Sequence, residues 1–282
     1  MGSADRYKPR MTKRIGETVL ITGASAGIGR EIAREFAGRG YNVVLVARSE
    51  EKLQQLAREL ANDFPITARV IAADLSSADG PSRVFRAISE TGLAIDILVN
   101  NAGIVEYAPF VEQETEKLLG LLGLNVIALT SMTSLFLPPM VSRGHGRILN
   151  VASVAAFQPT PMLAVYGATK AFVLSLTEAL SAELGGTGVT ITAVCPGFTS
   201  TEMLDKIRNE TGETMIPEFL QLDAGVVARE GVDACLAGTT IEVNGLTYKF
   251  LLMLESWQPR WVIRTVGGFV SRAFRPSPRE TE

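Results

Sequence analysis

The stretch TGASAGIG, residues 22–29, decides the fold of this 282-residue chain. It contains Gly-x-Ser-x-Gly around Ser25, a pattern typical of the nucleophile elbow of a hydrolase. It also contains Gly-x-Gly at Gly27 and Gly29, which is typical of a turn that binds a dinucleotide. Both interpretations require a strand before the stretch and a helix after it. The flanking sequences VLIT and REIAREFAGRG are typical of those two elements.

The hydrolase interpretation lacks two of the parts it needs. An oxyanion donor comes from the loop of an earlier strand, but the strand before Ser25 is the first in the chain. The only histidine, His145, stands in the glycine-flanked turn RGHGR. The phosphate interpretation has a physical reason, because glycines let the backbone N–H groups of a helix N-terminus approach a pyrophosphate. We therefore expect residues 22–29 to bind phosphate.

Short apolar runs alternate with longer amphipathic runs along the rest of the chain. Runs that are apolar on both sides are typical of strands buried in a parallel sheet, and their spacing predicts right-handed βαβ crossovers. The sequence therefore predicts an α/β doubly wound parallel sheet, a Rossmann fold with seven strands and helices on both faces. The strands are expected at 17–22, 42–47, 67–74, 95–100, 147–153, 189–194 and 239–245, and the helices at 28–39, 50–62, 81–91, 110–138 and 164–184.

The composition is that of one globular domain, with 46% hydrophobic residues and a net charge of −3. No nucleic-acid-binding pattern is present, so no nucleic-acid partner is expected. Two distant cysteines, Cys195 and Cys235, indicate a reducing compartment, and no Cys/His cluster has the spacing of metal ligands. Residues 1–15 lack a signal-peptide core, and the apolar run 126–141 is too short and too polar for a membrane span. We expect a cytoplasmic protein without a metal.

Further motifs stand at the ends of the predicted strands or on the helices that follow them. They are T-G-x-x-x-G-x-G at 22–29, NNAG at 100–103, LNV with Asn125, NVAS with Ser153, Y-x-x-x-K with Tyr166 and Lys170, and PGFTST at 196–201. In their order and spacing, these motifs resemble the short-chain dehydrogenase/reductase family, in its NADP-preferring branch. The resemblance covers about residues 16–243 and implies an enzyme that interconverts a carbonyl and an alcohol.

Tyr166 and Lys170 are four residues apart on one predicted helix, so their side chains share a face. An ordinary tyrosine titrates near pH 10, and a nearby ammonium favours the phenolate. At about 4 Å and an effective dielectric constant of about 20, the attraction is roughly 4 kcal/mol. The spacing therefore predicts a tyrosine whose pKa is lowered enough for general acid/base catalysis.

The family resemblance implies a role for each of four catalytic residues. Tyr166 would protonate the carbonyl oxygen, Ser153 would donate a hydrogen bond to it, Lys170 would hold the nicotinamide ribose, and Asn125 would hold a water molecule. Ordinary alternatives are a strand-end hydroxyl bonded to the backbone at Ser153 and a capped or kinked helix position at Asn125. The implied cofactor-binding residues are Thr22, Gly23, Ser25, Gly27, Ile28, Gly29, Arg48, Asp74, Leu75, Asn101, Ala102, Gly103, Tyr166, Lys170, Pro196, Gly197, Thr199 and Thr201.

The end of the second predicted strand favours NADP(H) over NAD(H). Ala47 stands twenty residues after Gly27, where an NAD enzyme carries an acid for the ribose 2′-hydroxyl, and Arg48 follows. A guanidinium there can form two hydrogen bonds with a 2′-phosphate. Alternatively, Arg48 is an ordinary solvated residue at a helix start. Many NADP-preferring relatives carry a base at the position of Ala26, from which this sequence departs.

The substrate pocket is expected to be apolar. The family's mobile lid corresponds to about residues 200–222, which mix apolar and charged residues. None of the expected wall residues is charged, which favours a hydrophobic ketone or aldehyde over a polyol or hydroxy acid. The expected walls are Ile104, Ala155, Phe157, Met162, Phe198 and Met203.

The chain divides into a polar N-terminus (1–15), a dehydrogenase domain (16–245) and a helical C-terminal extension (246–282). The extension contains both tryptophans and five arginines. It could pack over the substrate pocket or a dimer surface, or residues 256–282 could rest on an anionic membrane as a basic amphipathic segment. Members of the family that it resembles often pair through two long helices, here about 110–138 and 164–184, so the resemblance implies a homodimer or homotetramer.

Two functions remain open at this point. The first is an NADP(H)-dependent oxidoreductase acting on a small carbonyl or alcohol substrate. The second is a catalytically silent NADP-binding regulatory or scaffold protein, because a fold does not fix a function. The presence of all four catalytic residues favours the enzyme.

Overall fold

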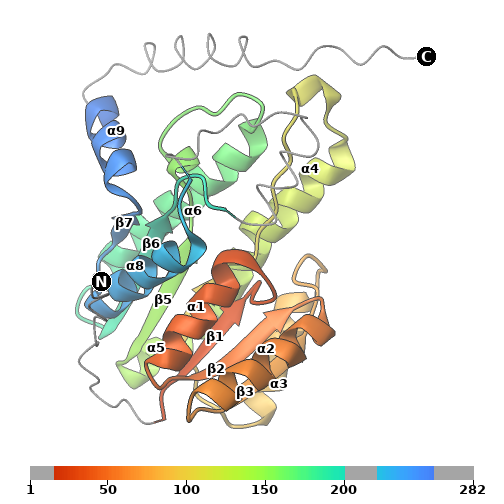
Figure 1. Ribbon diagram of the computed structural model, residues 1–282, viewed down its shortest axis with the longest axis vertical. Helices are drawn as coiled ribbons and strands as arrows, with labels where there is room; N and C mark the ends of the chain where they lie inside the picture. Colours follow the sequence, from red (N-terminus) through yellow and green to blue (C-terminus); the bar gives the residue numbers. More distant parts are fainter. Residues whose placement is uncertain (1–15, 201–220, 257–282) are drawn as a thin grey trace, which may run out of the picture.

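The computed structural model describes residues 16–200 and 221–256, and seven parallel strands form its single sheet (Figure 1). The strand order is β3-β2-β1-β4-β5-β6-β7, so the direction of winding reverses between β1 and β4. The predicted doubly wound fold is confirmed. The strands are β1 (Thr18–Thr22), β2 (Asn42–Ala47), β3 (Ala68–Ala72), β4 (Ile97–Asn100), β5 (Gly146–Val151), β6 (Val189–Cys195) and β7 (Ile241–Val243).

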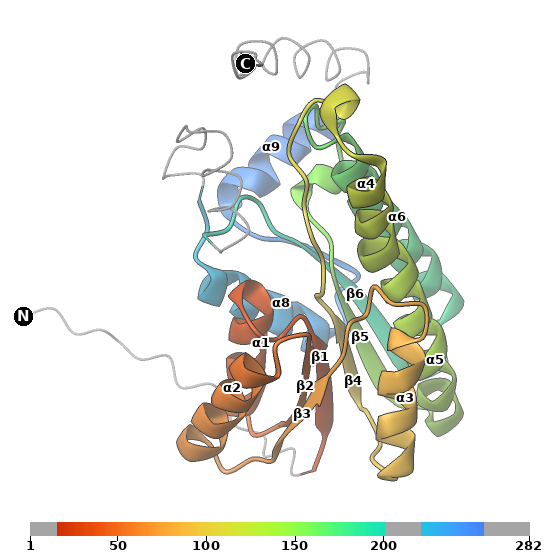
Figure 2. The same ribbon diagram turned by 90° about the vertical axis from the view of Figure 1, so that its right-hand side faces the viewer.

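Two layers of helices cover the sheet (Figure 2). Helices α1, α2 and α8 pack on one face, and α3, α5 and α6 pack on the other. This placement follows from the right-handed crossovers on either side of the switch between β1 and β4. The helices are α1 (Gly27–Gly38), α2 (Glu50–Asp63), α3 (Gly80–Glu90), α4 (Thr115–Leu122), α5 (Leu129–Arg143), α6 (Ala164–Glu183), α8 (Ala224–Ala237) and α9 (Leu246–Ser256).

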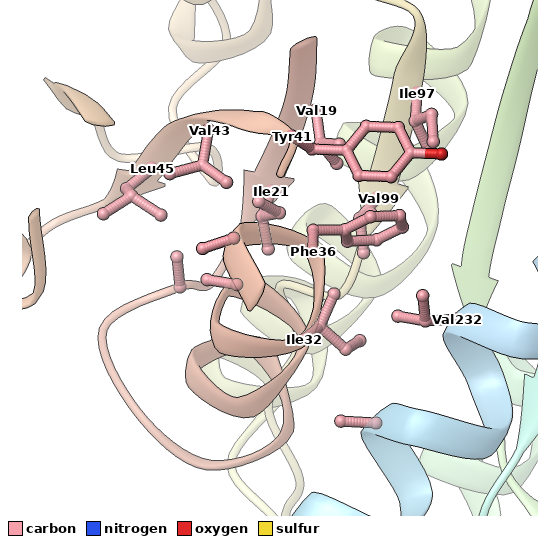
Figure 3. Close-up of a cluster of buried hydrophobic side chains, with 14 of the residues drawn as sticks. Val19, Ile21, Ile32, Phe36, Tyr41, Val43, Leu45, Ile97, Val99 and Val232 are labelled. Atoms are coloured by element: carbon pink, nitrogen blue, oxygen red, sulfur yellow. The ribbon is translucent and has the colours of Figure 1, made fainter. Parts of the chain in front are cut away.

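Alternate residues of the central strands enter opposite cores. Val19 and Ile21 of β1 belong to the core beneath α1, α2 and α8, whereas Leu20 belongs to the core on the other face. Figure 3 shows the first core, where the rings of Phe36 and Tyr41 meet edge to face with their centroids 5.3 Å apart. Each such buried side chain contributes about 1.5–3 kcal/mol, so these two cores hold the sheet as a rigid base for the loops at its edges.

The helix predicted at 110–138 is shifted toward the C-terminus and is less regular than expected. It runs from α4 through a π-helical turn (Gly123–Ala128) into α5, and it passes Pro138 and Pro139 to end at Arg143. The flanking Phe136 and Met140 are buried in the core, and this packing outweighs the break that proline favours.

This continuous helix also corrects the expectation about membrane spans. Its 29 residues and a mean hydropathy of 1.8 would suffice, by length and composition, to cross a membrane. In the fold, however, α5 packs against α3 and against β4 and β5. Only 33% of the apolar stretch is buried, so packing against α3 and the sheet accounts for part of its apolar character, and the prediction of a buried helix holds only in part.

The carboxyl ends of all seven strands lie at the same edge of the sheet, because every strand pair is parallel. α9 follows β7 and extends beyond this edge (Figures 1 and 2). The predicted helical extension therefore begins within the described residues. The predictions for residues 1–15, for most of the lid and for residues 257–282 lie outside the residues described.

Candidate active site

The turn after β1 presents backbone N–H groups. Gly23 and Gly27 have φ angles of +66° and +54°, which L side chains rarely adopt. Among the described residues, no side chain caps α1 at Ala26, whereas Ser49 caps α2. An uncapped helix start leaves N–H groups and the positive end of the helix dipole available to an anion. The turn therefore fits the pyrophosphate of a dinucleotide.

Asn101 braces this turn from the end of β4. Its Nδ2 donates to the carbonyl oxygens of Thr22 at 2.9 Å and Gly23 at 3.1 Å. Thr22 Oγ1 accepts in return from the backbone N–H groups of Asn101 and Ala102 at 2.9 and 3.1 Å. A Cβ atom at Gly23 would lie 2.8 Å from Asn101 Nδ2, and one at Gly29 would also collide with this amide. The glycines are thus required by the packing of the two loops as well as by phosphate approach.

Two charged residues stand at the ends of β2 and β3. Arg48 is exposed, and Asp74 is partly buried. The carboxylate of Asp74 accepts hydrogen bonds from the hydroxyl and backbone N–H of Ser76 at 2.6 and 2.9 Å. These bonds, and then the nearby charges of Arg48 and Arg83, hold the pKa of Asp74 below its usual value. Arg48 therefore lies within electrostatic reach of Asp74, another of the predicted cofactor-binding residues.

The remaining predicted nucleotide contacts surround the same turn. Ser25 and Ile28 are partly buried within it. Leu75 and Ala102 line a small hollow beside Thr22. Leu124, Ala128 and Met132 also line this hollow, so it lies on the α5 side of the sheet, and the nucleotide contacts of Leu75 and Ala102 stay a prediction.

Ser153, Tyr166 and Lys170 come together beyond the end of β5. Ser153 Oγ accepts from the backbone N–H of Ala155 at 3.2 Å and lies 3.5 Å from the carbonyl oxygen of Pro196. Ser153 also forms a hydrogen bond with the Tyr166 side chain. Tyr166 and Lys170 share a face of α6, with the Lys170 Nζ atom 5.6 Å from the centre of the Tyr166 ring. The predicted catalytic group is therefore assembled.

Burial controls the protonation of this group, which corrects the expectation that Lys170 lowers the pKa of Tyr166. Burial raises the pKa of Tyr166, and the hydrogen bond with Ser153 opposes that rise. Burial also lowers the pKa of Lys170 to about 8. The Lys170 ammonium points its Nζ at the carbonyl oxygen of Val151, 2.8 Å away, rather than at the phenol. At neutral pH the structure therefore holds a protonated phenol beside a protonated amine.

Asn125 lies in the π-helical turn between α4 and α5. Its Oδ1 accepts from the backbone N–H of Ile104 at 2.9 Å, and its Nδ2 donates to the Ile104 carbonyl oxygen at 2.9 Å and to Thr169 Oγ1 at 3.2 Å. A π-helical turn inserts an extra residue into a helix and often marks a functional site. Here the turn aims a buried amide at the loop after β4 and at the residue next to Lys170.

The loop after β6 continues this arrangement. The carbonyl oxygen of Pro196 accepts from the backbone N–H of Val154 at 3.0 Å, and Thr199 Oγ1 donates to the Gly197 carbonyl oxygen at 3.0 Å. Cys195 is fully buried, and burial raises the pKa of its thiol to about 12. The thiol is therefore protonated and unreactive. Thr201 lies outside the described residues.

The described members of the predicted substrate pocket lie on three loops at one edge of the sheet. The backbone N–H of Ala108 donates to the carbonyl oxygen of Met162 at 3.1 Å, which ties the loop after β4 to the loop after β5. Met162 has a φ angle of +69°, which is strained for a residue with a side chain. Ile104, Phe157 and Phe198 are partly or largely exposed there, Ala155 is buried, and Met203 lies outside the described residues.

The hydrolase interpretation is excluded by the topology. Ser25 follows β1 at the carboxyl edge of the sheet, whereas His145 precedes β5 at the opposite edge. His145 Nε2 lies 3.7 Å from Glu17 Oε1 instead. Among residues 16–200 and 221–256, no group of three or more His, Cys, Asp or Glu side chains could hold a metal ion.

Sequence reasoning missed two residues that support the site. Thr169 stands inside the motif YGATK, and its position beside Lys170 could have drawn attention to it. Tyr248, in α9, contacts the loop after β6 across fifty residues of sequence. No local pattern could have found that contact.

Comparison with known proteins identifies the family. The sequence pattern of the short chain dehydrogenase family matches residues 17–212, and the chain belongs to this family. Like other members, it is an oxidoreductase that interconverts CH–OH and C=O groups, on a fold that binds a nicotinamide cofactor.

The similar proteins share both the sequence and the fold. The very-long-chain 3-oxoacyl-CoA reductase of Rattus norvegicus is 33% identical over 91% of this chain and 80% of its own length. The Homo sapiens enzyme of the same name is 37% identical over 72% of this chain and 66% of its own length. A short-chain dehydrogenase from Sphingobium yanoikuyae in complex with NADPH superimposes with a TM-score of 0.75 at 31% identity, covering 94% of this chain and 98% of that protein.

Proposed function

We propose that this protein is an NADP(H)-dependent reductase of hydrophobic carbonyl compounds, with Tyr166 as its general acid. The observation that carries the proposal is the meeting of Ser153, Tyr166 and Lys170 at the sheet edge that also holds the uncapped start of α1. One edge thus combines a site for phosphates with a proton donor.

Tyr166, Ser153 and Lys170 have different roles in the proposed reaction. A bound NADPH supplies the hydride that reduces the carbonyl carbon. Tyr166, whose pKa is raised by burial, is protonated at neutral pH and donates its proton to the carbonyl oxygen. Ser153 donates a hydrogen bond to the same oxygen as negative charge develops on it. Lys170, whose Nζ donates to the Val151 carbonyl oxygen, would hold the nicotinamide ribose, the role that the family resemblance implies.

Asn125 acts on this group through its neighbours. Both ends of its amide are engaged with Ile104 and Thr169, so it fixes the loop after β4 against α6. A water molecule held by Asn125 for a proton relay to Lys170 remains part of the proposal, on the strength of the family resemblance.

The proposed preference for NADP(H) rests on the end of β2. Ala47 carries no acid to repel a 2′-phosphate, and Arg48 is exposed beside it. Arg48 already lies near the carboxylate of Asp74. The 2′-phosphate of NADP(H) would accept hydrogen bonds from the Arg48 guanidinium. NAD(H) has no phosphate there and would not gain these bonds.

The proposed substrate is a 3-oxoacyl thioester or a similarly apolar ketone. The relatives named above are 3-oxoacyl-CoA reductases, and a bulky-bulky ketone specific alcohol dehydrogenase from Comamonas testosteroni matches with a TM-score of 0.73 at 30% identity, covering 94% of this chain and 96% of that protein. The described walls of the pocket are apolar. We further propose a homo-oligomer in the cytoplasm, with membrane contact of residues 256–282 as an addition to be tested by truncation and vesicle binding.

A carbonyl panel tests this proposal. NADPH oxidation is followed optically with 3-oxoacyl thioesters of increasing chain length, bulky ketones and charged keto acids, and NADP⁺ reduction is followed with polyols. We expect turnover with the apolar carbonyls and little with the polyols and acids. Turnover restricted to polyols or charged acids would refute the substrate class. NADPH binding without reduction of any carbonyl would favour the silent binding protein.

A further inference from the structure

The inner side of α9 contacts the loop after β6. Tyr248 is only 7% exposed, although it belongs to a helix with several exposed apolar residues. Its hydroxyl oxygen accepts a hydrogen bond from the backbone N–H of Phe198 at 3.2 Å. Its ring lies against Gly197 so closely that a Cβ atom there would overlap the ring carbons.

The loop that Tyr248 contacts is continuous with the catalytic group. Pro196, next to Gly197, accepts from the backbone N–H of Val154 and lies 3.5 Å from Ser153 Oγ. On the other side, the Phe198 carbonyl oxygen accepts from the backbone N–H of Leu222 at 2.7 Å. Tyr248 therefore contacts Gly197, whose neighbour Pro196 lies beside the Ser153 hydroxyl.

The two contacts of Tyr248 restrict the loop in different ways. The ring fills the space that any side chain at residue 197 would need, so it sets how far the loop can move toward α9. The hydroxyl fixes the direction of the Phe198 peptide through one hydrogen bond. Burial raises the pKa of Tyr248, opposed by the bond from Phe198, so the hydroxyl stays neutral and able to accept.

We infer that Tyr248 is a positioning residue for the nicotinamide-binding loop 196–199, and that the C-terminal helix thereby sets the geometry of the active site. This inference rests on the proposed function, because Pro196, Gly197 and Thr199 are among the residues that the family resemblance implies for cofactor binding. It predicts that removal of one oxygen atom from α9 changes cofactor binding without a comparable change in stability.

Tyr248→Phe is the direct variant, because it removes the hydroxyl and keeps the ring. Tyr41→Phe is its matched control, since Tyr41 is 3% exposed and lies in the opposite core against Phe36. Hydrogen exchange of the Phe198 amide and the Kd for NADPH are measured without any substrate. For Tyr248→Phe we expect exchange at residue 198 to become about five- to tenfold faster and NADPH binding to weaken severalfold, as one hydrogen bond predicts. Tyr41→Phe should alter neither quantity.

A double variant tests the contact of the ring. Gly197→Ala alone should weaken NADPH binding, because its Cβ atom displaces the Tyr248 ring. Tyr248→Ala removes the ring and makes room for this Cβ atom. In the Tyr248→Ala background, Gly197→Ala should therefore weaken NADPH binding clearly less than it does in the wild-type background. Additive effects of the two substitutions would overturn the inference.

The result for Tyr248→Phe can also overturn the inference. Unchanged exchange at residue 198 and an unchanged Kd for NADPH would show that the tyrosine is only part of the core. Failure of the proposed function is seen separately, as wild-type protein that binds NADPH but oxidises none of it with any carbonyl. The exchange measurement needs no turnover and remains informative in that case.

Discussion

The two halves of the sheet's carboxyl edge are built to recognise a ligand by different means. At β1 and β4 the site consists of backbone: glycines with positive φ, an uncapped helix and the brace of Asn101. At β5 and β6 it consists of side chains, with Ser153, Tyr166 and Lys170 held by burial and by single hydrogen bonds. Cofactor binding at the first half should therefore be weakened by a substitution that adds an atom to a glycine. Catalysis at the second half should be weakened by a substitution that removes a polar atom.

The removal of one oxygen from the catalytic half should have the largest effect. Tyr166→Phe removes the proposed proton donor and leaves the ring, so kcat should fall by about 10²–10⁴-fold, the usual contribution of a general acid. The Kd for NADPH should change little, because the backbone half binds most of the cofactor. Steady-state kinetics and fluorescence titration measure the two quantities, and a variant that keeps more than half of wild-type turnover would remove Tyr166 from the mechanism.

An added methyl group should damage the nucleotide half. In Gly29→Ala the new Cβ atom collides with the Gly23 carbonyl and the Asn101 amide. Overpacking of this kind costs about 1–3 kcal/mol, and each 1.4 kcal/mol is about a tenfold change in affinity. We expect NADPH binding to weaken by about tenfold or more. Calorimetric titration measures it.

Gly120→Ala is the matched control for that substitution. Gly120 lies in α4, and nothing lies within 4 Å of a Cβ atom built there. Alanine in a helix is favoured over glycine by about 1 kcal/mol, so this variant should be slightly more stable and bind NADPH normally. Equal losses of affinity in both variants would contradict the proposed role of the glycine turn.

Removal of the Arg48 guanidinium should affect one cofactor and not the other. Arg48→Ala should lower kcat/KM with NADPH by about tenfold. A charge-assisted hydrogen bond contributes about 1.5–3 kcal/mol, and solvent exposure reduces this contribution. The value with NADH should hardly change, and Arg58→Ala, on the exposed side of α2, should change neither. A wild-type enzyme that uses NADH as efficiently as NADPH would refute the preference.

The pH dependence of stability should reveal the buried Lys170. Its pKa in the folded protein, about 8, lies below its ordinary value of 10.5. Between these values the unfolded chain holds a proton that the folded protein has released, so Lys170 makes stability rise with pH in this window. In the wild-type protein this contribution raises the free energy of unfolding by on the order of 1–3 kcal/mol, and Lys170→Met should lack that rise. Urea unfolding from pH 7.5 to 10.5 measures it, and parallel curves for the two proteins would contradict the depressed pKa.

The strands could be predicted from the sequence because each is a short apolar run between turns. The motifs placed Ser153 at a strand end and Tyr166 and Lys170 on the helix that follows. Pro138 and Pro139 misplaced only the predicted end of the long helix, because the burial of Phe136 and Met140 is a tertiary property. The π-helical turn around Asn125 had no periodic signal in the sequence.

The electrostatics of the site were the least predictable part. The spacing of Tyr166 and Lys170 correctly predicted that they share a helix face, but it could not show that Nζ is directed at the Val151 carbonyl. Nor could it show that Lys170 is buried while Tyr166 is half-buried. The contact between Tyr248 and Gly197 joins residues about fifty positions apart and depends on how α9 packs.

The central claim is that a protonated Tyr166 faces the substrate carbonyl beside the nicotinamide ring. A crystal structure with NADPH and an unreactive analogue of a 3-oxoacyl thioester tests it most directly. We predict that Tyr166 Oη and Ser153 Oγ both lie about 2.6–3.2 Å from the carbonyl oxygen, with the carbonyl carbon next to the reactive carbon of the nicotinamide. A nicotinamide ring bound away from Tyr166, with the Ser153 hydroxyl directed elsewhere, would contradict the account.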